Sequence, residues 1–145
     1  MATTTNPPVT KEQLQSARSG FLDAFAQCET ALIALGKRLN LKAGDYTLGQ
    51  RLDSLRKIKP SPTFSKAKAD SLATLVERLT CLNEIRVDVV HSRMCVAPIA
   101  GQMRACLINA KHADNDAPIA RLMTLEAFAR CNKELNEIAG ALAKI

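Results

Sequence analysis

Apolar residues recur at steps of three and four along most of the chain, which is the spacing of one face of an α-helix. In the first such stretch they run from Leu14 to Leu39. Thr10, followed three residues later by Gln13, has the pattern of a capping box at a helix start. The pattern therefore predicts a long first helix of about seven turns.

Two further helices follow. Thr47 is placed to cap a short helix over residues 48–58, after which Lys59-Pro60-Ser61-Pro62 breaks the chain. Ser61 or Thr63 is then expected to cap the longest uninterrupted helical pattern, which ends at about His91.

Beyond Ser92 the period changes. Two short apolar runs at 94–97 and 103–108 surround a glycine-containing turn, which predicts a β-hairpin. Pro98 is expected to restrict the first strand to a sheet edge or to end it. Thr124 is placed to cap a last helix over 125–144. The predicted fold is all-α, an up-down helical bundle with a short β-hairpin insertion before the last helix. Residues 1–9 are expected to be a disordered leader and 10–145 a single helical domain.

Composition agrees with a small helical bundle. With 145 residues, 3% aromatics and no Trp, one core is expected, built from Leu, Ala, Ile and Val. No apolar run approaches the roughly 18 residues that a membrane span needs, and the first residues do not resemble a signal peptide, so a cytoplasmic protein without a membrane partner is predicted. The five cysteines contain no Cys-x-x-Cys pair and are interpreted as small core residues. Neither a metal site nor a cofactor is predicted.

The positive charge is concentrated in one quarter of the chain. The net charge is +6, and residues 37–68 carry nine basic and two acidic residues. Such a stretch attracts phosphate backbones, although a solvated surface is the equally weighted alternative. The residues expected to contact such a phosphate backbone are Arg51, Arg56, Lys57 and Lys59.

The last turns of the long helix carry the candidate chemistry. Arginine neutralises phosphoryl oxygens and histidine moves protons, so Arg86 and His91 together suit phosphodiester chemistry. Asp88 lies three residues before His91 on the same face and can orient its ring. Steps of 100° per residue place Arg86 and His91 about 140° apart. They can meet only if the helix ends or distorts between them or if a second copy supplies the partner group, and a two-fold dimer is expected. The alternative is a helix end whose cations only complement its dipole.

The run Leu82-x-x-Ile85-Arg86-x-x-x-x-His91 resembles the signature of the HEPN superfamily, which are small all-α proteins marked by an arginine, four to six residues, and a histidine. The resemblance covers roughly residues 12–92, and includes Cys28-Glu29 midway along the first helix. In the family, arginine and histidine from two protomers commonly meet across a dimer interface and cleave RNA without a metal, with the ribose 2′-hydroxyl as nucleophile. Many members act in toxin–antitoxin or antiviral defence systems.

The resemblance implies that Arg86 holds the scissile phosphate, that His91 serves as acid or base, and that Glu29 supports them. The expected function is thus a metal-independent endoribonuclease, a homodimer that binds RNA and is controlled by an antitoxin or other regulatory protein. The family usually has a polar residue after the arginine, and here it is Val87. This leaves open a non-catalytic module that binds RNA, a nucleotide or a protein partner, with the 94–108 hairpin covering the site or binding that partner.

Overall fold

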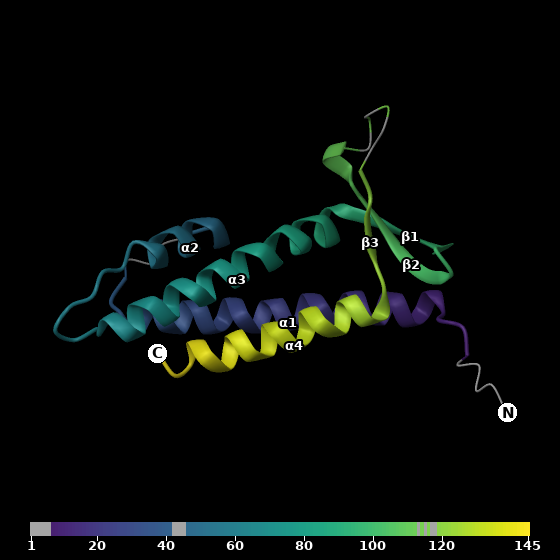
Figure 1. The fold of residues 1–145 in the computed structure, drawn as a ribbon. Helices are drawn as coiled ribbons and strands as arrows, with labels where there is room; N and C mark the ends of the chain where they lie inside the picture. Colours follow the sequence, from purple (N-terminus) through teal and green to yellow (C-terminus); the bar gives the residue numbers. More distant parts are fainter. Residues whose placement is uncertain (1–6, 42–45, 113, 115, 117–118) are drawn as a thin grey trace, which may run out of the picture.

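The computed structural model describes residues 7–41, 46–112, 114, 116 and 119–145. These residues form the elements α1 Lys11–Arg38, α2 Leu48–Arg56, α3 Lys66–His91, β1 Ser92–Ile99, β2 Gln102–Asn109, a short 3₁₀ turn at Ala110–His112, β3 Arg121–Met123 and α4 Leu125–Leu142 (Figure 1). Of the predicted leader, residues 1–6 lie outside the described part, whereas Val9 is half-buried and packs against the core.

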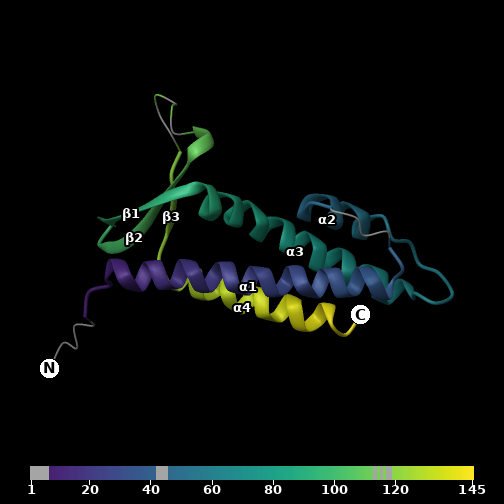
Figure 2. The same ribbon diagram turned by 180° about the vertical axis from the view of Figure 1, so that it is seen from behind.

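The three long helices form the body of the molecule. Figures 1 and 2 show α1 and α4 lying side by side in the same direction, with α3 running the opposite way across them. The Cys28 thiol on α1 donates to the Leu135 carbonyl on α4 at 3.0 Å, and Arg38 donates to the Leu142 carbonyl at 2.9 Å. Contact points that advance together along both helices confirm that α1 and α4 are parallel.

The core is mainly aliphatic, as the composition predicts, with three phenylalanines at its centre. The rings of Phe21 and Phe25 on α1 have centroids 6.1 Å apart, and Phe128 on α4 lies 6.2 Å from Phe21. All three rings are almost completely buried. Tilted aromatic pairs at this spacing hold neighbouring helices in a defined orientation.

Most helix starts follow the sequence. Thr10 and Thr47 form complete capping boxes, and Thr124 accepts the first-turn hydrogen bond of α4, so these three predictions are confirmed. The predicted start of α3 is wrong, because the N-cap is Ser65 rather than Ser61 or Thr63. The backbones of Ser61 and Phe64 hydrogen-bond to each other in both directions, and this tight turn delays the helix.

The predicted all-α class is wrong, because the chain between α3 and α4 forms a three-stranded antiparallel sheet in the order β1-β2-β3. Both strands of the predicted hairpin form and are longer than expected. The third strand was not predicted. Its three residues are too few to show an alternating pattern, and it is specified by pairing with β2, where Met123 lies opposite Ala105.

The hairpin has a tight turn and an edge strand that contains proline. Ala100 and Gly101 have φ values of 51° and 77°, the left-handed conformation at both central positions that a type I′ turn requires. Pro98 lies on β1, which is an edge strand as its sequence indicates. The inward face of the sheet, with Ala105 and Leu107 buried, packs on the core.

One arginine of α1 joins the helices to the sheet. The Arg18 guanidinium donates to the carbonyl of Val89 at 2.6 Å and to that of Ser92 at 2.9 Å. These are carbonyls in the last turn of α3 and at the first residue of β1, and helix-end carbonyls need an external partner. The chain therefore passes from α3 into β1 without a loop, and His91 is the last helical residue.

Candidate functional site

Arg86 lies on α3 and points to α1, where it is held from several sides. Its Nε is 3.5 Å from Glu29 Oε1, and its Nη1 donates to Asn83 Oδ1 at 3.4 Å. Its guanidinium carbon lies 5.3 Å from the centroid of the Phe25 ring. A cation over an aromatic face and beside a carboxylate is fixed in orientation. The Arg86 side chain nevertheless keeps 31% of its surface exposed, so an anion can reach it from solvent.

Glu29 is therefore brought to Arg86, as the resemblance implies for a supporting group. Its side chain is 35% exposed, and it lies on the α1 turn that follows Phe25. Phe25 and Asn83 also contact Arg86 and help to orient it, and the sequence analysis did not identify either residue. Phe25 belongs to the regular apolar stripe of α1, where nothing distinguishes it from the other core residues.

His91 is in a contrasting environment. It is exposed at the end of α3 and makes no hydrogen bond or ion pair with any other residue that the structure describes. A free imidazole on the surface can exchange protons with a ligand. It can do so without first breaking a contact inside the chain.

Arg86 and His91 do not meet within one chain. Arg86 points to α1, whereas His91 lies on the stripe of α3 that also carries Thr80, since eleven residues bring a helix back to within about 20°. Thr80 Oγ1 accepts from Arg56 of α2 at 2.6 Å, so this stripe faces the α2 side. Glu29 and Phe25, which hold Arg86, lie on α1 instead. Because α3 is one uninterrupted helix over Lys66–His91, the angular separation predicted from the sequence applies in the folded chain.

Asp88 does not orient His91, and this expectation is corrected. Its Oδ2 accepts from Arg121 Nε on β3 at 2.7 Å, and its Oδ1 accepts from Asn109 Nδ2 on β2 at 3.3 Å. A charge-assisted bond to a guanidinium outcompetes a contact with an exposed imidazole on the next turn. Asp88 instead ties the motif helix to both neighbouring strands. Arg121 and Asn109 were missed because they lie in segments without a periodic signal.

The basic residues of the second quarter differ in availability. Arg56 is engaged, because it pairs with Asp53 at 2.7 Å and lies 3.8 Å from Glu77. Lys57 and Lys59 are exposed and make no ion pair with another described residue. Arg51 is half-buried and lines a narrow hollow between α1 and α2. Lys42 of the same basic stretch lies outside the described residues.

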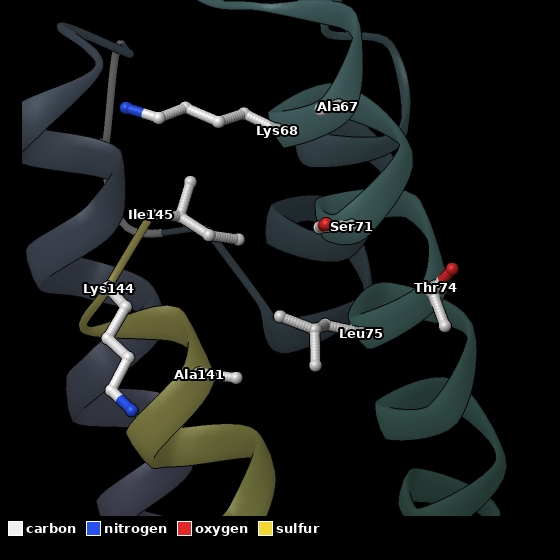
Figure 3. A pocket seen from close by; sticks show the side chains of 8 residues that line it. All are labelled: Ala67, Lys68, Ser71, Thr74, Leu75, Ala141, Lys144 and Ile145. Carbon is white, nitrogen blue, oxygen red and sulfur yellow. The ribbon is translucent and has the colours of Figure 1, made fainter.

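Two surface hollows are larger than the one that Arg51 lines. One lies far from the motif, and the other lies beside Lys59. The larger, of about 520 Å³, lies between α3 and α4, where Lys68 and Lys144 flank an apolar floor that includes Leu75 and Ile145 (Figure 3). Its Ser71 is fifteen residues from Arg86 along α3, or about 22 Å. The other, of about 440 Å³, is lined by Lys59 together with Arg38 and Asn40, so it continues the basic surface beside α2.

Neither a family model, a curated protein nor a solved structure matches the chain. In the described ranges, no helix has the length and apolarity that crossing a membrane requires. The same residues contain no group of three or more His, Cys, Asp or Glu side chains arranged as metal ligands.

A double-mutant cycle tests the anchor that Asp88 provides. Asp88→Asn and Arg121→Gln should each lower the free energy of unfolding, because each removes one partner of a part-buried ion pair whose side chains are 26% and 33% exposed. The coupling energy should be about 0.5–2 kcal/mol by urea denaturation. Effects that add without coupling would show that the pair does not hold β3 to α3.

Proposed function

We propose that the chain is a metal-independent endoribonuclease of the HEPN type, acting as a cytoplasmic homodimer in a toxin–antitoxin or antiviral defence system. The observation that carries the proposal is the contrast between the two motif side chains. Arg86 is fixed in orientation yet accessible, and His91 is exposed and uncommitted, about 7.5 Å further along the same helix.

The chemistry assigns one role to each side chain. His91 accepts the proton of a ribose 2′-hydroxyl, whose oxygen then attacks the adjacent phosphorus. The bond from phosphorus to the 5′-oxygen breaks, and the leaving oxygen takes up a proton from solvent. The partner subunit's Arg86 lies beside the non-bridging oxygens and stabilises the negative charge that develops on them. Glu29 and Phe25 keep that guanidinium in one orientation, which avoids ordering it during the reaction. The products are a 2′,3′-cyclic phosphate and a 5′-hydroxyl.

Exposed valines beside the motif support a dimer. Val87 follows Arg86 and Val90 precedes His91, and they are 36% and 45% exposed. Apolar side chains at the surface gain free energy when a second surface covers them. A second copy laid on this part of α3 would bury both valines and bring the motif residues of the two protomers together.

The alternative is a module that binds RNA, a nucleotide or a regulatory protein without cutting. Two observations favour it: Glu29 already neutralises part of the Arg86 charge, and an apolar residue stands at Val87 where the family usually has a polar one. The same exposed valines would then contact a protein such as an antitoxin. Cleavage assays separate the two functions.

Replacing His91 by Ala tests the catalytic role. Cleavage of RNA in the presence of EDTA should fall by about 10²–10⁴-fold, the usual loss for a general acid–base group. Stability should change by less than about 0.5 kcal/mol, because the side chain is exposed and unbonded. His112→Ala is the matched control, since His112 is also exposed and lies off the motif helix. Equal activity of the two variants would refute the assignment.

Mixing two inactive variants tests the shared site. If each site takes Arg86 from one protomer and His91 from the other, a heterodimer of Arg86→Ala and His91→Ala contains one intact site. Mixed subunits, exchanged in mild denaturant and refolded, should recover about one quarter of the wild-type activity by statistical assortment. Each variant treated alone should recover none. A mixture that stays inactive despite heterodimer formation would place both residues in one protomer's site.

Salt dependence tests the basic surface beside α2. Each phosphate contact on a single strand contributes about −0.7 to the slope of log affinity against log salt, so Lys57→Glu with Lys59→Glu should flatten the slope by about 1.4. Arg56 is left unchanged, because its ion pairs with Asp53 and Glu77 would be lost. Lys133→Glu on α4 is the control. A slope that the α2 variant leaves unchanged would assign RNA binding to another surface.

A further inference from the structure

Two cysteines face each other across the hairpin. The pairing of β1 with β2 places Cys95 directly opposite Cys106. Residues opposite each other in an antiparallel pair project from the same face of the sheet. This is the outer face, because the alternate positions Ala105 and Leu107 are the buried ones.

The spacing is that of a disulfide. Opposite residues in an antiparallel ladder have Cα atoms about 4.5–5.5 Å apart. Disulfides join cysteines whose Cα atoms are about 4.4–6.8 Å apart, so the register of Cys95 and Cys106 meets the Cα requirement of a disulfide. The turn at Ala100 and Gly101 and the uninterrupted register between the strands fix this relation. Both thiols are free in the structure.

The other described cysteines lie in different surroundings. Cys28 and Cys131 are buried in the core, and burial raises the pKa of the Cys28 thiol to about 11. Such thiols are rarely ionised near neutral pH and are out of reach of a reagent. Cys81 is exposed, but it is on α3 rather than in the strand ladder. Only Cys95, which is exposed, and Cys106, which is half-buried, combine access with a facing partner on the described sheet.

We propose that Cys95 and Cys106 form a reversible intrachain disulfide by exchange with a small-molecule disulfide such as glutathione disulfide. The exposed Cys95 thiolate attacks one sulfur of the reagent, forms a mixed disulfide and releases one glutathione thiolate. The Cys106 thiolate then attacks the Cys95 sulfur and displaces the second glutathione. Two protein thiols are oxidised and one glutathione disulfide is reduced to two thiols, which take up the two protons.

The cross-link acts close to the motif helix. It closes the segment from Cys95 to Cys106, which contains the turn, and fastens edge strand β1 to central strand β2. Cys95 is four residues after His91, and β2 carries Asn109, which donates to Asp88 on α3. Oxidation therefore restrains the strands that hold the end of α3. The cross-link rests on the hairpin register alone and holds whether or not the protein cuts RNA.

Peptide mapping tests the proposal, because Arg104 lies between the two cysteines. The folded protein is incubated with glutathione disulfide and then denatured in acidic urea, which exposes the buried thiols while suppressing disulfide exchange. All free thiols are alkylated in the denatured state, and the protein is digested with trypsin without reduction. The peptide 94–104 should appear linked to 105–111, and the alkylated cysteines should fall from five to three. Dithiothreitol should restore all five. The linked peptide should form about tenfold faster in the folded than in the urea-denatured protein, since the fold positions the thiols.

Variants identify the bond. Cys106→Ser should leave Cys95 as a stable mixed disulfide with glutathione, because the resolving thiol is gone, whereas Cys81→Ser should form the linked peptide normally. A non-reducing gel should show the oxidised protein at monomer size. A linkage found only between copies, separate glutathione adducts on Cys95 and Cys106 in the wild-type protein, or equal rates in folded and denatured chains would each overturn the proposal.

Discussion

The arrangement of the motif depends on one guanidinium. Arg18 reaches from α1 to the carbonyls of Val89 and Ser92, and so satisfies acceptors on both sides of the junction between α3 and β1. Without such a partner, carbonyls at a part-buried helix end would lose their hydrogen bonds to water and gain nothing in return. Because the junction is fixed to α1, both Arg86 and the sheet are placed relative to the same helix. The same contact holds the junction at which His91 is the last helical residue.

The three charged side chains of the motif segment have different tasks. Arg86 is directed to α1 by Glu29 and Phe25, and Asp88 is directed to the sheet by Arg121 and Asn109. Arg86 and Asp88 thus attach one turn of α3 to two different neighbours. Of the three side chains, only His91 is left without a partner among the described residues. His91 lies at the end of a helix whose neighbouring residues are fixed by contacts, and its own side chain remains available for a ligand.

Local patterns predicted the helices well but not the partners of the charged residues. The caps at Thr10, Thr47 and Thr124, the end of α3 at His91 and the two hairpin strands follow from periods and capping rules that act over a few residues. Strand β3 does not, since three residues carry no period and pairing with β2 specifies them. The helix rule of three residues linked Asp88 to His91, whereas Arg121, which is 33 residues away in sequence, is its actual partner. Glu29 was found only through the resemblance, because its partner Arg86 is likewise remote in sequence.

The sheet lies in the connection between α3 and α4, where the chain can change in length. α3 ends and α4 begins at the same end of the bundle, so the strands are an excursion from a connection that two antiparallel helices make with a short loop (Figure 1). The bundle itself sets no limit on how far this excursion extends. A change in the length of the hairpin beyond its buried residues Ala105 and Leu107 therefore need not shift the register of the helices. Variation there would alter what approaches His91 and leave the packing of α1 on α4 untouched.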